Sequence, residues 1–521
     1  MRGRAPRFAL ALAVAAAASS VPALANWTAS GRLIYEHREW DSTGFTGAVV
    51  TQPARFADVE VIDPTKNGAK AHLAWGKTDA NGDFSVAVTD STTRSKVRVL
   101  ILTQSTQTAD LFVKVTTPGG SVYAANSPDF NNHGPNTNVN WGTLVASAFA
   151  GAEAFNIFDH AVYGADFIKS LSGSRPGSSK LVTFRWSATA GNGNSSTSGN
   201  TVSLRDSAGY DDTVILHEWS HYIMNSYSKT TNPGGLHFLA ECFEDPRLAY
   251  DEARASFFGC SVRRYNGWAN ANVYLRTDGG PGPGHMTNWY NLEDVEQYDC
   301  DGDTSEVSNS RAMWDIADKA ATTDFTPGID DTPPDALALP DLESWQVFTG
   351  PIKNVTYVTG ESFWDGWFDP AVANGNLAAM RDIWSYLTIE FFPDAFEPNN
   401  TTATATQIAA NDPALHLTYF YDGNGDGKGE IDTDLFRFNA VSGSGYTIET
   451  LNLLSAADTN LELLDTNGTT VLASNNDRAV GDKSSRIVWT APRSDVFYVR
   501  SKRPSGGYTI YGSYDLLLTT P

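Results

Sequence analysis

The stretch Asp211–Tyr222, which reads DDTVILHEWSHY, constrains the fold of this chain more than any other. An acidic and hydroxyl start followed by an apolar run predicts a capped and mostly buried α-helix. His217 and His221 then lie on one helical face, where their ring nitrogens can bind one zinc ion. Glu218 projects beside the metal and can accept a proton from zinc-bound water. The alternative is a pair of hydrogen-bonded core histidines with an incidental glutamate.

The first 25 residues have the composition of a secretory signal peptide. Three arginines precede an apolar run over residues 8–18, and Ala23, Leu24 and Ala25 form a small-x-small cleavage site. We therefore expect residues 1–25 to be removed and the protein to be secreted, to the periplasm or the extracellular space. No later segment reaches the ~20 apolar residues that a bilayer requires, so we expect no membrane span.

Length, charge and cysteine content narrow the classes of protein further. A chain of 521 residues exceeds one hydrophobic core, which predicts roughly two to four domains. The formal net charge is −23, from 37 basic and 60 acidic residues, which argues against nucleic-acid binding and suits calcium. Cys242, Cys260 and Cys300 allow one disulfide at most. Cys242 with Cys260 is the favoured pair, because both flank a helix predicted below.

Residues 26–118 are predicted to form a β-sandwich. Short runs rich in β-branched and aromatic residues alternate there with turn residues. The segments Ala54–Val61 and Thr78–Phe84 resemble the transthyretin-like, carboxypeptidase-regulatory-like accessory domains of secreted proteins. Nothing in this region has the pattern of a catalytic site. Residues 119–145 are rich in Gly, Pro, Asn and Ser, which predicts a linker or an irregular entry to the next domain.

A helix-rich domain is predicted over residues 140–392. Apolar residues recur at helical spacing over residues 146–158 and 161–171, and residues 181–186 form a strand. A flexible loop over 191–200 and a short strand over 201–204 precede the helix with the two histidines.

A third metal ligand must come from outside that helix. The extended HExxHxxGxxH pattern is excluded, because Met224 and Tyr227 stand at its glycine and third histidine. Downstream, Pro246–Gly259 is predicted as a helix with Pro in its first turn and Gly at its end. Most neighbours of Glu252 on this helix are small, so another helix can approach closely there.

Four segments together resemble the bacterial secreted zinc metallopeptidases of the gluzincin type, over roughly residues 150–390. They are Tyr210–His221, Gly234–His237, Ala249–Phe258 and Ala312–Ile316. The resemblance implies His217, His221 and Glu252 as zinc ligands and Glu218 as the general base. Ala253 and Arg254 stand where such proteins often have Gly-Trp, which puts the nearby substrate pocket in doubt. The rival third ligands are Glu241, Glu244, Asp251 and His237. Asp251 lies about 100° round the helix from Glu252 and is expected to be dispensable for metal binding.

Other polar residues of this region leave alternatives open. The donor that stabilises a tetrahedral oxyanion is not placed, and His237, His285, Tyr290 and Tyr298 are candidates. An acidic run either holds calcium or is a solvated loop, the second being favoured. That run comprises Glu293, Asp294, Glu296, Asp299, Asp301, Asp303 and Glu306. Further helices are predicted over Val307–Ala321 and Leu377–Phe391.

Residues 393–521 are predicted to form a second β-sandwich. Asp394–Asn400, with Asp432–Phe436 and Asn475–Asp477, resembles the pre-peptidase C-terminal (PPC) domain of secreted bacterial peptidases. Asp422–Glu430 has the pattern of a calcium loop, with Asp422, Asn424 and Asp426 as oxygen ligands. Because position 12 is Thr433, a glycine-rich acidic turn is the alternative.

These patterns predict a multidomain α+β protein. It has an N-terminal β-sandwich, a central helix-rich zincin-like metallopeptidase domain and a C-terminal β-sandwich. The predicted function is that of an exported zinc-dependent endopeptidase acting on protein or peptide substrates, with calcium as a second cofactor. The alternative is a secreted surface or matrix-binding protein that carries a degenerate, non-catalytic peptidase domain.

Overall fold

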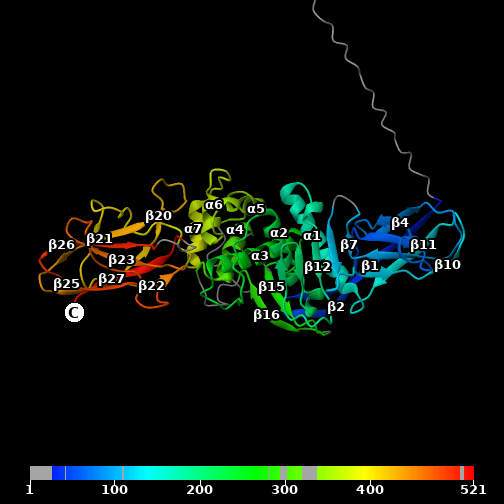
Figure 1. Ribbon diagram of the computed structural model, residues 1–521, viewed down its shortest axis with the longest axis horizontal. Coiled ribbons are helices and arrows are strands. Elements are labelled where there is room, and N and C mark those ends of the chain that lie inside the picture. Colours follow the sequence, from blue (N-terminus) through cyan, green and yellow to red (C-terminus); the bar gives the residue numbers. More distant parts are fainter. Residues whose placement is uncertain are drawn as a thin grey trace, which may run out of the picture.

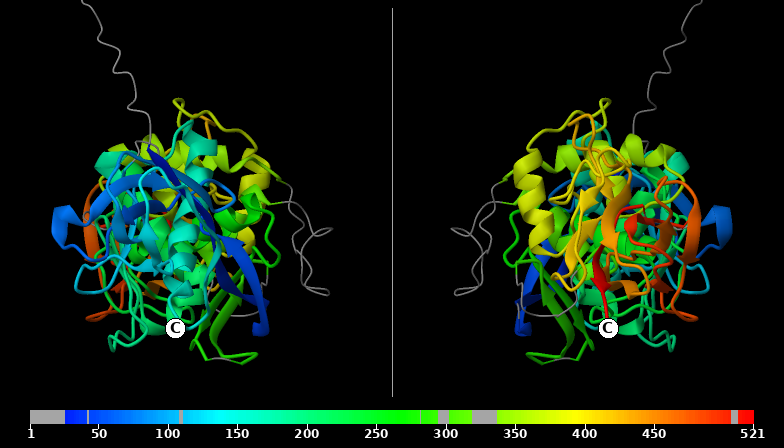
Figure 2. Two further views of the ribbon diagram at one scale, coloured as in Figure 1. Left: turned by 90° about the vertical axis from the view of Figure 1, so that its right-hand side faces the viewer. Right: turned by 90° about the vertical axis from the view of Figure 1, so that its left-hand side faces the viewer.

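The computed structural model describes residues 26–41, 43–107, 111–280, 282–293, 302–318, 337–504 and 510–521. Figure 1 shows an elongated molecule with sheets at both ends and helices in the middle. In the end-on views of Figure 2 the three parts project onto one another, so they follow one another along a single axis. The predicted multidomain α+β class is confirmed.

Two sheets build the N-terminal part, and β1 (Trp27–Asp41) is the central strand of the first. It pairs parallel with β11 (Val139–Ala146) and antiparallel with β2 (Gly44–Pro53) and β5 (Asp83–Val88). Burial alternates along β5, as expected of a strand with one face in a core. The second sheet consists of β6 (Arg94–Leu102), β3 (Asp58–Ile62), β4 (His72–Lys77), β9 (Ala124–Asn126) and β10 (Phe130–His133).

The linker predicted over residues 119–145 is wrong, because this segment contributes β9, β10 and β11 to the N-terminal sheets. The predicted sandwich strand Leu111–Val115 is also placed differently. It forms β8 (Val113–Thr116), which pairs parallel with β12 (Val182–Arg185) in the central part. Strand partners depend on contacts between distant residues, and β9 and β10 are short and polar. Local composition therefore gave no signal for either pairing.

The central part combines one sheet with packed helices. The sheet has the order β13-β14-β12-β8-β7, and α1 (Ala152–Ser172) packs against it. Next to α1 lies α2 (Asp212–Tyr227), the helix with the two histidines, and α3 (Pro246–Tyr265) packs along α2. The remaining elements of the central part are β7 (Gln104–Ser105), β13 (Ser196–Ser198), β14 (Thr201–Ser203), β15 (Val273–Thr277), β16 (Met286–Asn291), α4 (Glu306–Ala317), α5 (Asp341–Thr349), α6 (Gly360–Trp367) and α7 (Leu377–Tyr386).

α2 starts at the predicted acidic cap, and α3 starts at the predicted Pro246. Asp211 accepts a hydrogen bond from the Val214 N–H at 3.2 Å, and Asp245 caps α3 ahead of Pro246. The predicted end of α3 at Gly259 is wrong, since the helix runs on to Tyr265. Gly259 instead lies close against α2, where an added Cβ would be 3.2 Å from the backbone nitrogen of His217. A helical glycine has a packing role here rather than a terminating one.

The C-terminal part is a sandwich of two antiparallel-rich sheets. One has the order β17-β21-β26-β23-β24 and the other β18-β27-β22-β25. Aromatic and aliphatic side chains fill the space between them, among them Phe436, Phe497 and Leu516. The strands are β17 (Thr406–Gln407), β18 (Leu415–Thr418), β21 (Thr433–Ala440), β22 (Gly445–Leu454), β23 (Asn460–Leu464), β24 (Val471–Asn475), β25 (Arg486–Thr490), β26 (Asp495–Lys502) and β27 (Ser513–Thr519); β19 (Phe420–Tyr421) pairs with β20 (Glu430–Ile431).

The predicted Cys242–Cys260 disulfide is wrong. Cys260 is a free, buried thiol on α3, and Cys242 is disulfide-bonded to another residue. Cys260 is buried in the core on α3, which a pattern of three cysteines in the sequence does not reveal. In the described part of the chain, no helix is long and apolar enough to cross a bilayer.

Several predictions fall on residues that the structure does not describe. They are the signal peptide over residues 1–25, the candidate donor Tyr298, and four members of the acidic run, Asp294, Glu296, Asp299 and Asp301. The end of the helix predicted over Val307–Ala321 also lies outside the described residues, which show α4 from Glu306 to Ala317.

Candidate metal centre

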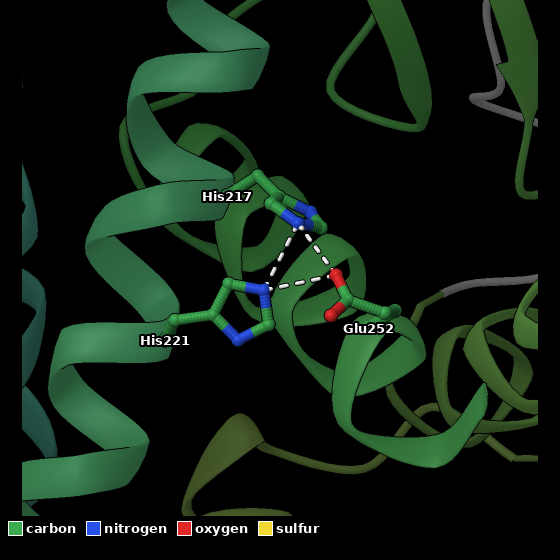
Figure 3. A group of neighbouring side chains, drawn as sticks. All are labelled: His217, His221 and Glu252. Atoms are coloured by element: carbon green, nitrogen blue, oxygen red, sulfur yellow. Dashed lines mark hydrogen bonds and ion pairs between the residues drawn. The ribbon is translucent and has the colours of Figure 1, made fainter. Parts of the chain in front are cut away.

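Two neighbouring helices bring the candidate ligands together. His217 and His221 project from one face of α2, and Glu252 reaches toward them from α3 (Figure 3). Most other side chains of α2 are buried, among them Ile215, Leu216 and Trp219, so the two rings project from a helix that is packed into the core. A side chain at Gly259 would meet the backbone of α2, so this glycine allows the two helices to pack closely.

The ligand atoms form a small triangle. His217 Nε2 lies 3.2 Å from Glu252 Oε2, His221 Nε2 lies 3.0 Å from the same oxygen, and the two ring nitrogens are 3.1 Å apart. Tetrahedral zinc with bonds of about 2.0–2.1 Å has ligand–ligand edges of about 3.3 Å. These three residues therefore could hold a metal ion at nearly the observed spacing.

Each candidate ligand is oriented by a second polar group. His217 Nδ1 is 3.0 Å from Ser256 Oγ, and His221 Nδ1 is 3.4 Å from Asp251 Oδ2. Asn232 donates to the free oxygen of Glu252 at 3.2 Å. A partner on the outer ring nitrogen fixes both the rotation and the tautomer of a histidine ligand.

Charge couples the buried side chains of the centre. Burial alone would lower the pKa of His221, but Glu252 and Asp251 raise it well above its usual value. Burial alone would raise the pKa of Glu252, yet the two histidines hold it well below its usual value. The neighbouring histidines thus keep Glu252 ionised in a buried position, and a ligand for a cation must be ionised in this way.

A cavity of about 850 Å³ opens onto this triangle. Glu218 lines it at 7% exposure, and Thr197 donates a hydrogen bond to Glu218 Oε2 at 2.7 Å. Other lining residues come from the β13 hairpin, the segment after α2, β15 and the start of α4. They include Arg205, Leu236, His237, Phe238, Tyr274, Arg276 and Glu306.

The rival third ligands have other positions. Asp251 is engaged with Arg254 at 2.9 Å and with Thr230 at 2.9 Å, and reaches the site only behind His221. His237 Nε2 lies 3.5 Å from Glu252, whereas Glu241 is exposed. Glu244 is buried and accepts a hydrogen bond from the Phe238 N–H at 3.3 Å.

Among the candidate oxyanion donors, His237 lines the cavity. His285 pairs with Asp278 at 2.9 Å, and the lining of the cavity includes neither His285 nor Tyr290. Sequence reasoning missed Tyr274, which lines the cavity and packs edge-on against His217 with ring centroids 5.5 Å apart. Strand alternation in β15 was the available signal, because it puts Tyr274 and Arg276 on one face.

The acidic run is buried where it is described, so the favoured solvated loop is wrong there. Glu293, Asp303 and Glu306 are at most 6% exposed. Glu293 accepts a hydrogen bond from the Trp314 indole. Glu306 lies on α4, which packs on α3, and Asp303 lies near Ser455 of the C-terminal part. Such burial depends on distant segments, so no local pattern indicates it.

The C-terminal part holds two groups of oxygen ligands. In the predicted calcium loop, Asp422 accepts the N–H groups of Gly425 and Gly427, and Asn424 and Asp426 hydrogen-bond each other. A second group was missed from sequence. Asp394, Glu397 and Asp434 offer ligand oxygens that all lie within 4.8 Å of one another. Their positions in the segments that resemble a PPC domain were a signal for proximity, though not for metal binding.

Comparison with known proteins relates the chain to peptidases. Residues 28–151 match the family model described as the Mycolysin middle domain. The matched segment runs from β1 to the residue before α1, so it covers both N-terminal sheets and less than half of the chain. The protein is thus peptidase-related. The likeness of residues 26–118 to transthyretin-like domains stays a prediction.

No curated protein is a significant match. Similar solved structures include the pre-peptidase C-terminal domain of a collagenase from Bacillus anthracis, at 18% identity over 22% of this chain and 94% of that chain, with a TM-score of 0.17. Another is PliG from Aeromonas hydrophila, a periplasmic inhibitor of g-type lysozyme, at 10% identity over 22% of this chain and 96% of that chain, with a TM-score of 0.16. TM-scores this low carry no information about the function of this chain.

Proposed function

We propose that this protein is an exported zinc-dependent endopeptidase of gluzincin-like type, with His217, His221 and Glu252 as the zinc ligands. The observation that carries the proposal is the triangle of ligand atoms, with edges of 3.0–3.2 Å. Two nitrogens and a carboxylate oxygen are a donor set that suits zinc. A divalent cation at the centre of the triangle would contact all three ligand atoms at once.

When bound, zinc would polarise the scissile carbonyl and acidify the attacking water. Glu218 accepts the proton of that water and later delivers it to the leaving amine. Thr197 holds the Glu218 carboxylate through its hydroxyl, 2.7 Å from Oε2. Because Glu218 follows His217 directly on α2, the base stays beside the metal ligands while facing the cavity.

Tyr274 is the residue that we assign as donor to the developing oxyanion. Burial raises the pKa of its phenol well above the usual value, and Asp211 and Tyr290 raise it further. The hydroxyl therefore stays protonated and can donate a hydrogen bond at neutral pH. Its place in the cavity wall next to His217 suits this role.

We propose that the protein is secreted and that its substrates are proteins or peptides. A cavity of about 850 Å³ is large enough for several residues of an extended peptide. The match to the Mycolysin middle domain supports a peptidase-related role. The alternative, a non-catalytic surface or matrix-binding protein, would not need Glu218 and its hydroxyl partner in the cavity.

The test is a comparison of Glu218→Gln with the wild type on casein at neutral pH. The amide is nearly isosteric but cannot accept the proton, so turnover should fall at least ~10²-fold while zinc is retained. Glu241→Gln is the matched control, since it removes an exposed charge of the same region. Near-wild-type activity of Glu218→Gln would sink the assignment of the base.

We further propose calcium as a structural ion of the C-terminal part, held by Asp394, Glu397 and Asp434. Burial raises the pKa of Asp434 well above its usual value, and the charges of Asp432 and Asp394 add to the effect. Carboxylates crowded in this way favour a hard cation with oxygen ligands. Calcium in the loop of Asp422, Asn424 and Asp426 stays a prediction.

A further inference from the structure

One carboxylate in the cavity wall takes no part in the mechanism described above. Glu306 is the first residue of α4 and lines the same cavity as His217 and Glu218. It is 6% exposed, and its Oε2 atom is buried without a hydrogen-bond partner. The start of α4 is fixed by Ser305, whose side chain accepts from the Ser308 N–H at 3.3 Å. The cap thus fixes the backbone from which the Glu306 side chain enters the cavity wall.

A second carboxylate without a cationic partner stands behind this one. Glu244 is tied to the start of α4, because its N–H donates to the Thr304 carbonyl at 3.1 Å. Its Oε2 atom is likewise buried without a partner, and the residue is 8% exposed. After burial itself, the nearby charges of Glu252 and Glu244 raise the pKa of Glu306. The carboxyl groups of Glu244, Glu252 and Glu306 thus lie close enough together at this end of the cavity to disfavour one another's charge.

The other charged groups that line the cavity have partners. Glu218 is bound to Thr197, and Asp251 to Arg254. Arg205 pairs with Asp211 at 2.5 Å. Arg276 donates to the Gly193 carbonyl at 3.3 Å. Glu306 differs from these groups, and a buried carboxylate of this kind is stabilised most by a cation that enters the cavity.

We propose that Glu306 is a specificity-determining residue that binds a positively charged group of the substrate, close to the scissile bond. Two sources supply that chemistry, the side chain of Arg or Lys and the N-terminal ammonium of a peptide. The inference rests on the proposed peptidase function, because the cavity is taken as the substrate site. It assigns a preference for basic peptides, which suits the acidity of the whole chain.

The test measures peptide binding and turnover separately. Binding is measured by fluorescence anisotropy on the zinc-loaded Glu218→Gln protein, with and without Glu306→Gln. The probes are acetylated hexapeptides with Arg or its neutral isostere citrulline at each position in turn, and one neutral peptide with a free N-terminus. Turnover of the same peptides is measured as kcat/KM in the wild type and Glu306→Gln, and Glu241→Gln serves as the control for a lost exposed charge.

We expect the protein with Glu306 to bind a charged peptide about tenfold or more tightly than its neutral counterpart, at one position of the peptide. In Glu306→Gln that ratio should fall to within about threefold, while the neutral peptide binds as before. If the Arg peptides show this preference, the charge comes from a side chain; if the peptide with a free N-terminus shows it, the charge comes from the terminal ammonium. Equal binding of charged and neutral probes, or an equal loss for both in Glu306→Gln, would overturn the inference. Charge-selective binding without any turnover would support the inference about Glu306 but contradict the proposed peptidase function.

Discussion

Asp251 is the residue whose replacement tests the geometry of the metal centre most sharply. Its Oδ2 atom stands 3.4 Å from His221 Nδ1, so it orients a proposed ligand without touching the metal. From sequence alone, Asp251 is expected to be dispensable for metal binding, because it lies about 100° round the helix from Glu252. Its contact with His221 leads us to propose a positioning role instead. A carboxylate behind a histidine ligand typically contributes 10–100-fold to metal affinity, which is about 1.4–2.7 kcal/mol.

Asp251→Asn is the suitable change, because Asp251→Ala would leave the fully buried Arg254 facing an apolar methyl group. We expect zinc affinity to fall by about 10–100-fold, against a much larger loss in Glu252→Ala. Affinity is measured by competition with a chromophoric chelator. Asp245→Asn is the control, since it keeps a capping side chain on the same helix far from His221. An affinity within twofold of wild type, or a loss equal to that of Glu252→Ala, would refute the positioning role.

Three further outcomes are expected. Burial raises the pKa of Asp303 to about 7, above about 3.9 in an unfolded chain, so the folded state keeps a proton that the unfolded state releases and stability falls as pH rises from about 4 to 7. Asp303→Asn should therefore raise the melting temperature more at pH 8 than at pH 5, and equal shifts at both would contradict this. Calcium at about 100 times its Kd should stabilise the wild type by about 2.7 kcal/mol but not Asp434→Asn, and a shared shift in calorimetry would exclude that site. Gly164→Ala places a Cβ 2.6 Å from the Trp219 ring, so chemical denaturation should show a loss of about 1–3 kcal/mol, and an unchanged midpoint would mean that the ring moves freely.

Much of the central site can be predicted from the sequence, because it depends on residues that are close together in the chain. The spacing of His217 and His221 and the acidic cap before them predict a helix with both rings on one face. Small residues around Glu252 correctly predicted a close helix–helix approach, which the structure shows at Gly259. Helical periodicity and capping involve residues within a few positions of each other, so one sequence is enough to detect them.

The features that sequence reasoning missed depend on contacts between residues far apart in the chain. β8 and β11 joined sheets that their local composition did not indicate, because strand pairing is set by partners elsewhere in the chain. Glu306 was assigned to a solvated run because its burial comes from the packing of α4 on α3. Tyr274 enters the cavity on a strand whose partner and position are tertiary features.

The metal content of the purified protein tests the proposed zinc centre most directly. Elemental analysis of the dialysed chain should give one zinc per molecule, removed by a strong chelator together with casein hydrolysis and restored with it on adding zinc. Glu252→Ala, prepared in parallel, should retain far less zinc with its helices intact by circular dichroism. A folded wild-type protein without zinc, or one whose hydrolysis is unaffected by chelation, would contradict the proposal.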